Sequence, residues 1–384
     1  MLLIWSTNDF TIGGRPYPDF PIVLRDSMES VVEVNQFFRH YLTRGVIGSE
    51  QSWPSTGRAL YDYFGFLEAH NLVWTDVDRG EEKALVAGYR DYCLNDVKLA
   101  RNTVRQRLLY VCTFYEYALE QGWVDRLPFS FEDRFVPHSD KGFLAHIDAS
   151  SNTQPVRDVM PRRHKLLPKF LNKEQVQALV AATTNPHHRM MTRFALQTGL
   201  RREEIATFPL AYVFNPDARH GIGRNVMVRL DPFDGSGMMT KGSKPRDIWI
   251  SRRFMSELYR YSVLVRGELA SLHATQHPTL FLTQEGKPYS NHGKQIEVFI
   301  RENGRKAGIK AHTHMLRHTY STHTLVALQR NREKLTVEPL VFLQRQLGHS
   351  SIATTMIYLH LINSLVDDAV LAYDDELNDW META

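Results

Sequence analysis

The sequence predicts a mainly helical protein that carries a small antiparallel β-sheet and divides into two domains. Apolar residues recur at intervals of three and four along most of the chain, which is the pattern of α-helices with one buried face. Two short runs, 226–230 and 248–250, alternate apolar and polar residues, as half-buried strands do. A proline-interrupted stretch without periodicity, 126–170, separates two periodic regions, and 384 residues suit two domains.

The N-terminal region is predicted to be an arm followed by a helical domain. Residues 1–27 are rich in proline, glycine and aromatic residues and are expected to form an extended arm. Residues 28–125 carry four helical patterns, of which the clearest has apolar residues at Val104, Leu108, Val111, Tyr115 and Leu119. The first helix is expected to begin near Ser30 and the second near Ser55. The third is expected to span roughly 81–95.

Basic residues gather at two places that could follow a DNA backbone. The fourth helix opens with Arg101, Arg105 and Arg107. The alternative is a solvated helix start, but cations in a first turn oppose the helix dipole, which favours a functional reason. The stretch 126–170 is expected to be a basic interdomain linker, and its end carries Arg162, Arg163 and Lys165. The alternative is an ordinary polar linker, and part of so long a connection could be ordered.

Residues 171–384 are predicted to form a second, mostly helical domain. Asn172 can cap its first helix. Further helices are expected at 187–199, 202–207, 252–270, 290–307, 313–330, 338–347 and 351–362. The last stretch, 365–384, is expected to be an amphipathic helix with an acidic outer face.

The charge distribution favours a polyanionic partner. Residues 365–384 hold seven acids and no Lys or Arg, and removing these seven charges from the formal net charge of +3 leaves +10 on the rest of the chain. A basic body suits DNA, and a solvated surface with an acidic tail is the alternative. The two cysteines give no disulfide framework, and no apolar run could span a membrane. We therefore expect a cytoplasmic protein.

The first chemical motif is the segment Thr198-Gly199-Leu200-Arg201-Arg202-Glu203-Glu204. Glu204 lies three residues after Arg201, so the two share a helical face and the carboxylate can hold the guanidinium in place. Arg202 points about 100° away and is the competing candidate.

A second motif, Lys241-Gly242-Ser243-Lys244-Pro245-Arg246, forms a predicted turn between extended stretches. A lysine on such a turn can swing toward a leaving oxygen as a general acid. Lys244 is the rival of Lys241, and the spacing does not fit a P-loop.

The third motif is His314-Met315-Leu316-Arg317-His318, in which His314 and Arg317 project together from one helix. They can meet one phosphate from the same side. His314 and His318 could instead bind zinc, but the segment lacks the glutamate of zinc peptidases. We interpret His318 as a packed or capping histidine.

The last motif begins with Leu347-Gly348-His349 and ends at Tyr358, nine residues after His349. His349 can donate to a phosphate oxygen. A phenol has a pKa of about 10, so a tyrosine nucleophile needs a site that eases proton loss and neutralises charge on the phosphate. Two arginines suit that task, because a guanidinium makes paired bonds to phosphate oxygens.

In order and spacing these four motifs resemble the tyrosine recombinase (phage integrase) family. The segment around Thr103–Leu108, with Phe114-Tyr115-Glu116-Tyr117-Ala118, is similar to the family's core-binding domain. The resemblance implies a helical core-binding (SAM-like) DNA-binding domain over 28–125 and an α+β catalytic domain over 171–384. It covers roughly 28–125 and 170–384 and departs at the arm, the linker and Phe208-Pro209-Leu210.

The resemblance also implies a reaction. Tyr358 would attack a scissile phosphate and form a 3′-phosphotyrosyl link, and Lys241 would protonate the leaving 5′ hydroxyl. The phosphate would be held by Arg201, Arg317, His314 and His349, with Glu204 in support. No cofactor is expected, since the covalent link conserves the bond energy without ATP or a metal. The expected assembly is a nucleoid-associated homo-tetramer on two double-stranded DNA sites, joined by exchange of C-terminal helices; a helix packed on its own domain is the alternative.

Three other functions remain open from the sequence. They are a DNA-binding regulator of the same fold that does not cut, a related topoisomerase that relaxes DNA as a monomer, and a metal-dependent hydrolase. The intact motif set, above all Tyr358, argues against the regulator. The sequence does not distinguish an integrase from a resolvase or a transposase.

Overall fold

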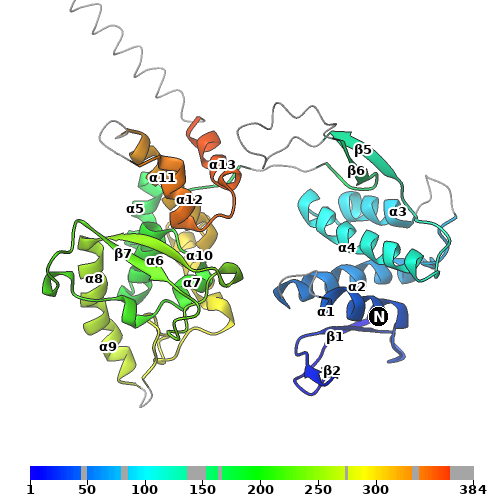
Figure 1. The fold of residues 1–384 in the computed structure, drawn as a ribbon, viewed down its shortest axis with the longest axis horizontal. Helices are drawn as coiled ribbons and strands as arrows, with labels where there is room; N and C mark the ends of the chain where they lie inside the picture. Colours follow the sequence, from blue (N-terminus) through cyan, green and yellow to red (C-terminus); the bar gives the residue numbers. More distant parts are fainter. Residues whose placement is uncertain are drawn as a thin grey trace, which may run out of the picture. The chain divides into compact units, whose positions relative to one another are not determined.

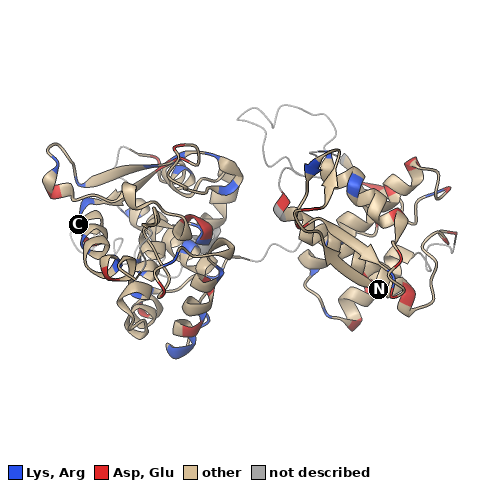
Figure 2. Cartoon of the chain, turned by 90° about the horizontal axis from the view of Figure 1, so that it is seen from below, with Lys and Arg blue, Asp and Glu red and all other residues tan. Residues whose placement is uncertain are grey.

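The computed structural model describes residues 1–44, 50–78, 85–135, 153–162, 167–272, 276–330 and 337–363. The chain splits into two compact units, Met1–Lys165 and Leu166–Ala384. The predicted fold class, mainly helical with small antiparallel sheets, is confirmed. In both units, basic Lys and Arg residues are mixed with acidic Asp and Glu residues (Figure 2).

Four helices form the body of the described part of the first unit (Figure 1). They are α1 (Val32–Thr43), α2 (Trp53–Ala69), α3 (Leu85–Asp91) and α4 (Arg101–Glu120), with a π-helical turn at Tyr92–Asp96 and a 3-10 turn at Glu50–Ser52. Aromatic side chains fill the space between them: Phe37, Phe64 and Phe114 are buried and pack edge to face. Residues 79–84, at the expected start of the third helix, lie outside the described residues.

Residues 1–27, expected to be an extended arm, are instead folded onto the first unit. Strand β1 (Leu2–Trp5) pairs antiparallel with β4 (Pro21–Leu24), and β2 (Thr11–Ile12) pairs with β3 (Arg15–Pro16). The physical reason is burial, because Phe20 and Val23 are at most 1% exposed and join the core of this unit. Proline and glycine in this segment therefore mark turns.

The described parts of 126–170 are also ordered. Strand β5 (Phe131–Phe135) pairs antiparallel with β6 (Thr153–Arg157). Arg157 donates to both carboxylate oxygens of Glu116 on α4, at 2.7 Å each, and Val159 is buried in the same core. This hairpin is therefore attached to the first unit. Residues 136–152 and 163–166 lie outside the described residues.

The second unit is built from helices around one two-stranded antiparallel sheet. Strand β7 (Asn225–Leu230) pairs with β8 (Arg246–Ser251), and the alternation predicted for both strands is confirmed by buried Val226, Val228 and Ile248. The helices are α5 (Lys173–Ala182), α6 (Pro186–Thr198), α7 (Arg202–Ala206), α8 (Arg252–Val263), α9 (Val265–Ala270), α10 (Lys294–Lys306), α11 (Thr313–Arg330), α12 (Pro339–Leu347) and α13 (Ile352–Asn363). Short 3-10 turns lie at Leu210–Tyr212, Pro216–Ala218, Lys241–Ser243 and Asn291–Gly293.

Local sequence signals explain several boundaries in this unit. The Asn172 cap of α5 is confirmed, because its side chain accepts from the Gln175 backbone at 2.8 Å while the Gln175 side chain accepts in return. The helix expected over 252–270 is two helices, α8 and α9, which meet at Leu264. The Phe208-Pro209-Leu210 departure has a packing role: Phe208 is fully buried, and its ring packs against that of Phe194.

Packing brings distant segments of the second unit together. Helix α11 packs against α6, α12 and α13, and α12 packs against β8 (Figure 1). The α6–α7 turn, the start of β8, one face of α11 and the α12–α13 connection therefore lie beside one another. The predicted acidic helix over 365–384 lies outside the described residues.

Candidate active site

The turn between α6 and α7 places Arg201 at the start of a helix. Helix α6 ends at Thr198, and Gly199 follows in the left-handed conformation with φ at +65°. A Cβ at Gly199 would lie 2.4 Å from the ring of Tyr320, so both the backbone and the available space require glycine here. Arg201 is the N-cap of α7, and its backbone N–H donates to Glu204 Oε2 at 2.7 Å.

Glu204 is a buried carboxylate shared by two arginines. Its side chain is 1% exposed, and it accepts from Arg201 Nη1 at 3.1 Å and from both terminal nitrogens of Arg246 at 2.8 Å. Burial alone would raise the pKa of Glu204, but the hydrogen bonds and charge of Arg246, with the charge of Arg201, hold it below its ordinary value of 4.5. The ionised carboxylate therefore fixes both guanidinium groups.

Arg246 belongs to this cluster although the sequence patterns pointed only to the lysines of its segment. It is the first residue of β8, and Gly348 covers it, since a Cβ at Gly348 would lie 2.7 Å from Arg246 Cδ. The available signal was its place at the end of the Lys-Gly-Ser-Lys-Pro-Arg segment. The competing candidate Arg202 faces elsewhere, because its Nε donates to the His292 carbonyl at 3.0 Å.

Arg317 is buried between two helix ends. Its side chain is 2% exposed, with Nη1 donating to the Gly199 carbonyl at 2.7 Å and Nη2 donating to the Leu347 carbonyl at 2.6 Å. Burial, and then the charge of Arg201, lowers the pKa of Arg317 to about 9, so the group remains charged at neutral pH. Arg317 thereby ties the α6–α7 turn to the end of α12.

Two histidines of α11 lie one helical turn apart and contact each other. The ring centroids of His314 and His318 are 4.4 Å apart in an edge-to-face arrangement. Burial, with the charge of Arg317, lowers the pKa of His314, and burial, with the charges of His314 and Arg317, lowers the pKa of His318 to about 4. Both rings are therefore neutral at pH 7. His318, interpreted from the sequence as a packed or capping residue, places Nδ1 2.9 Å from Tyr358 Oη.

Tyr358 lies in α13 with its ring against His349. The two rings are nearly parallel, at an interplanar angle of 11° and a centroid distance of 6.3 Å, and His349 Nδ1 lies 3.0 Å from Thr355 Oγ1. Burial, followed by the charge of Arg317, lowers the pKa of His349 to about 3. The side chain of Tyr358 is 2% exposed, and burial raises its pKa, although a Ser321 hydrogen bond and the charge of Arg317 oppose that rise.

The structure thus gathers six of the residues singled out in the sequence into one cluster, Arg201, Glu204, His314, Arg317, His349 and Tyr358, and adds Arg246 and His318. Lys241 lies in the turn Lys241–Ser243 between β7 and β8, and its side chain is exposed, as is that of Lys244. Within the described ranges, neither lysine is linked to the cluster by a hydrogen bond or ion pair.

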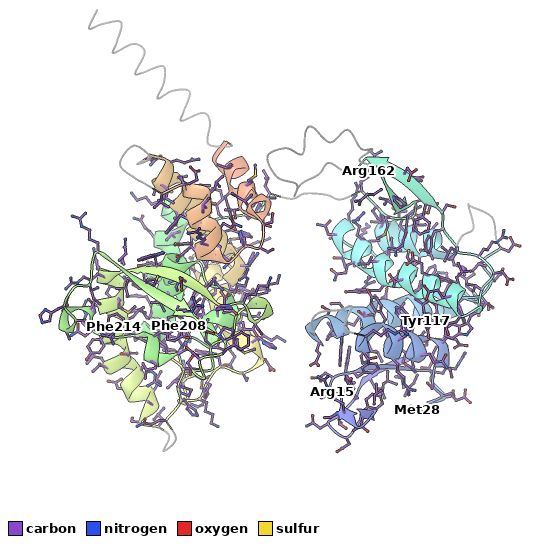
Figure 3. The ribbon with its side chains drawn as sticks, in the orientation of Figure 1. Arg15, Met28, Tyr117, Arg162, Phe208 and Phe214 are labelled. Atoms are coloured by element: carbon purple, nitrogen blue, oxygen red, sulfur yellow. The ribbon has the colours of Figure 1, made fainter. Side chains whose placement is uncertain are left out.

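The cations proposed for DNA contact have different surroundings. Arg101 is exposed. Arg162 is exposed as well (Figure 3). Arg105 donates to the Pro161 carbonyl, and Arg107 forms an ion pair with Asp62 of α2. These two side chains therefore hold parts of the first unit together. Arg163 and Lys165 lie outside the described residues.

The cluster has the donors needed to hold one phosphate. Arg201 and Arg317 supply charged planar donors, and neutral imidazoles beside them supply further hydrogen bonds. No group of three or more His, Cys, Asp or Glu residues is arranged to hold a metal ion within the described part of the chain.

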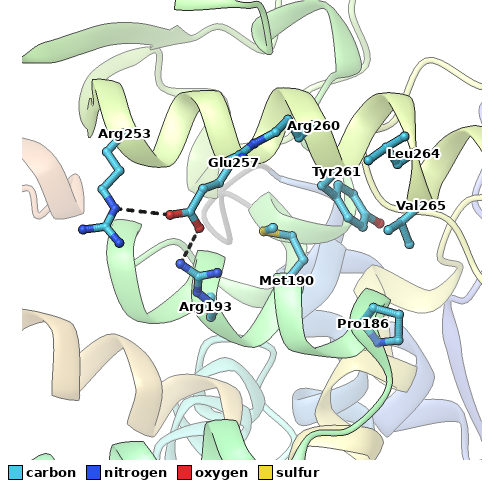
Figure 4. A pocket seen from close by; sticks show the side chains of 9 residues that line it. All are labelled: Pro186, Met190, Arg193, Arg253, Glu257, Arg260, Tyr261, Leu264 and Val265. Carbon is cyan, nitrogen blue, oxygen red and sulfur yellow. Dashed lines mark hydrogen bonds and ion pairs between the residues drawn. The ribbon is translucent and has the colours of Figure 1, made fainter.

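A pocket of about 450 Å³ lies elsewhere in this unit, between α6 and α8 (Figure 4). Met190, Leu264 and Val265 contribute apolar lining, and Arg193 and Arg253 both pair with Glu257. None of the site residues named from the sequence lines this pocket, and its carboxylate is already neutralised. Arg260 lines it as well, so this pocket differs from the cluster around Arg317 in its place in the unit and not in a lack of cations.

Comparisons with known proteins agree on one family. The model of the phage integrase family matches residues 169–364, more than half of the chain. Tyrosine recombinase XerC of Lacticaseibacillus casei is 25% identical over 82% of this chain and 89% of that protein, and tyrosine recombinase XerD of Staphylococcus aureus is 30% identical over 54% of this chain and 62% of that protein.

Solved structures share the fold. The site-specific recombinase XerH in a post-cleavage complex with its palindromic difH substrate aligns with a TM-score of 0.56 at 13% identity, covering 89% of this chain and 88% of that chain. A dimer of lambda integrase residues 75–356 on a core site aligns with a TM-score of 0.52 at 11% identity, covering 85% of this chain and 94% of that chain.

Among the helices that the structure describes, none combines the length and the apolar character of a membrane span. The chain belongs to the phage integrase, or tyrosine recombinase, family.

Proposed function

We propose that this protein is a site-specific DNA recombinase that cuts and rejoins double-stranded DNA through Tyr358. The observation that carries the proposal is the convergence of a phenol, the buried guanidinium group of Arg317, the partly exposed one of Arg201 and three imidazoles from segments far apart in the sequence. Arg317 alone joins carbonyl groups 118 and 30 residues away. Family membership and the DNA-bound structural relatives support the same chemistry.

In the proposed reaction, Tyr358 Oη attacks a scissile phosphate and the bond to the 5′ oxygen breaks. Arg201 and Arg317 neutralise charge on the non-bridging oxygens, with His314 and His349 as further donors. Glu204 keeps Arg201 in place. Lys241, on its exposed turn, moves in to protonate the 5′ oxygen. A 5′ hydroxyl from another strand then reverses the step and exchanges partners, without ATP or a metal.

The phenol must first become accessible. Because the Tyr358 side chain is 2% exposed, α13 has to shift before Oη can reach a phosphate. We propose that DNA binding drives this shift within a tetramer on two DNA sites, in which the acidic 365–384 segments are exchanged between protomers. Their seven negative charges suit the basic remainder of the chain. Exposed cations such as Arg101 and Arg162 would contact the DNA backbone.

Covalent capture tests the proposal with no DNA site specified in advance. Wild-type protein is incubated with a pool of nicked duplexes that contain a randomised segment, and products are resolved in a denaturing gel. We expect a protein–DNA adduct that resists chelator, needs no ATP and disappears in Tyr358→Phe. Sequencing of the captured DNA should show an enriched site.

The same experiment separates the alternative functions. Absence of any adduct from the wild-type protein would favour a DNA-binding regulator that does not cut. Capture without sequence enrichment, together with relaxation of any supercoiled plasmid, would favour a topoisomerase. Loss of the adduct in chelator would favour a metal-dependent enzyme.

A further inference from the structure

The hydroxyl of Tyr358 has a specific partner that the reaction described above does not use. His318 Nδ1 lies 2.9 Å from Tyr358 Oη, which is an ordinary hydrogen-bond distance. The contact joins α11 to α13 across 40 residues of sequence. It is therefore a product of the tertiary fold and not of local helix geometry.

Neighbouring groups are less suited to take the phenolic proton. Ser321 acts on the Tyr358 hydroxyl, but its own hydroxyl donates to the Arg317 carbonyl at 2.7 Å and has no basic nitrogen. The Nδ1 of His349 is engaged with Thr355, and its ring lies parallel to the phenol ring. Among the described residues, His318 is the one whose ring nitrogen is hydrogen-bonded to Oη.

We infer that His318 is the proton acceptor for Tyr358 during DNA cleavage, and this inference depends on the function proposed above. As Oη attacks the phosphorus, the O–H bond of Tyr358 breaks and its proton passes to His318 Nδ1, while the bond between phosphorus and the 5′ oxygen breaks and Lys241 protonates that oxygen. In the rejoining step the imidazolium returns the proton as the phenol leaves. Atoms and charges balance, and no further reactant is needed.

The position of His318 on α11 suits this role even after α13 moves. His314, Arg317, His318 and Ser321 are spaced so that they share one face of α11. A phosphate held by His314 and Arg317 must therefore lie within about one helical turn of His318. A phenol that attacks this phosphate would therefore still face α11 on the side that carries His318.

The electrostatic surroundings keep this imidazole neutral, and the positive charge around it weakens it as a proton acceptor until a phosphate arrives. Burial and nearby positive charge lower the pKa of His318 to about 4, so Nδ1 is unprotonated at neutral pH in the tautomer that carries its proton on Nε2. Among the described residues, the charged and titratable groups around the Tyr358–His318 pair are His312, His314, Arg317, His349, Arg201, Arg246 and the carboxylate of Glu204. The phosphate would offset part of this positive charge on arrival, which makes proton transfer easier during attack.

The test compares adduct formation by wild type, His318→Asn and Lys241→Ala on the nicked duplex selected by wild-type protein. Asparagine can place an amide near the position of Nδ1, so it preserves a hydrogen bond to the phenol without accepting a proton. Two forms of the duplex are used, one with the ordinary phosphate and one with sulfur as the 5′ bridging atom. A sulfur leaving group needs no general acid, so it restores Lys241→Ala but not a variant that lacks the proton acceptor.

We expect His318→Asn to form the adduct about 10²-fold more slowly on both substrates near neutral pH. The defect should shrink as pH rises, because the ionised fraction of an ordinary phenol grows about tenfold per pH unit below its pKa. Added imidazole should partly restore His318→Ala. The control is His323→Gln on the same helix, which preserves an Nε2-like donor to the Leu171 carbonyl and should cleave at the wild-type rate.

Several results would overturn the inference. His318→Asn could cleave as fast as wild type, or faster, in which case His318 merely restrains the phenol. A slowing by one constant factor at every pH, or rescue by the sulfur substrate, would also contradict proton acceptance. If His318→Asn lacks the wild-type circular dichroism spectrum, the same comparison is made with His318→Gln. Failure of wild-type protein to form any adduct would instead refute the proposed function itself.

Discussion

Glu204 and Arg246 form a two-bonded ion pair at the centre of the site, with both hydrogen bonds at 2.8 Å. The carboxylate is 1% exposed and the guanidinium 11% exposed, so the pair is shielded from water. Arg201 shares the same carboxylate. One buried acid therefore sets the positions of two cations that come from different elements.

Replacing Glu204 with Gln should destabilise the second unit strongly. Two guanidinium groups would then face each other across a neutral amide, and breaking a buried ion pair from one side typically costs about 3–5 kcal/mol. The free energy of unfolding, measured in urea, should fall by about that amount. The control is Asp217→Asn, whose exposed pair with Arg252 should contribute less than about 1 kcal/mol. Equal effects of the two variants would contradict a structural role for the buried pair.

The contribution of Glu204 to the free energy of unfolding should also disappear in acid. Its pKa is lower in the folded protein than its ordinary value of 4.5, so its stabilisation is fully present above that value and is lost as pH falls through the folded pKa. The difference in stability between wild type and Glu204→Gln should therefore be constant from neutral pH down to about pH 5 and should narrow below pH 4.5. A difference that stays constant at still lower pH would show that the carboxylate charge is not its source.

Substituting Ala for Gly348 should disturb the site through Arg246. The backbone φ is +65°, and the new Cβ would lie 2.7 Å from Arg246 Cδ and 2.9 Å from Nε. We expect a loss above the roughly 1–2 kcal/mol that a left-handed conformation costs an L-residue, together with slower adduct formation. Gly221→Ala is the matched control, because its φ is +79° and nothing lies within 4 Å of its Cβ. Similar unfolding energies and cleavage rates in the two variants would refute the packing argument.

Arg101 and Arg107 should respond differently to substitution by Ala although both open α4. Arg107 is paired with Asp62 inside the first unit, so Arg107→Ala should lower stability and leave the salt dependence of DNA binding unchanged. Arg101 is exposed, and Arg101→Ala should weaken binding and reduce the slope of log affinity against log salt by about 1. Binding measured across a salt series, with thermal unfolding alongside, separates these outcomes. A reduced salt slope in Arg107→Ala would show that this side chain leaves Asp62 to contact phosphate.

Local sequence patterns predicted the elements of the second unit well. The helices at α6, α10, α11, α12 and α13 and the alternating strands β7 and β8 were predicted, because a buried face imposes a period of 3.6 or 2 on the residues themselves. The Asn172 cap was equally local. The arm over 1–27 was mispredicted, because its turns are visible in the sequence but the burial of Phe20 is not.

The sequence by itself determined which chemical groups this protein has, their order, and the helices and strands that carry them. Only the tertiary structure decided that Glu204 pairs with Arg246, that His318 reaches Tyr358, and that Arg107 faces Asp62. The physical reason is range. Periodicity and capping act over a few residues, whereas these contacts join residues 40 to 45 positions apart and depend on how whole helices pack.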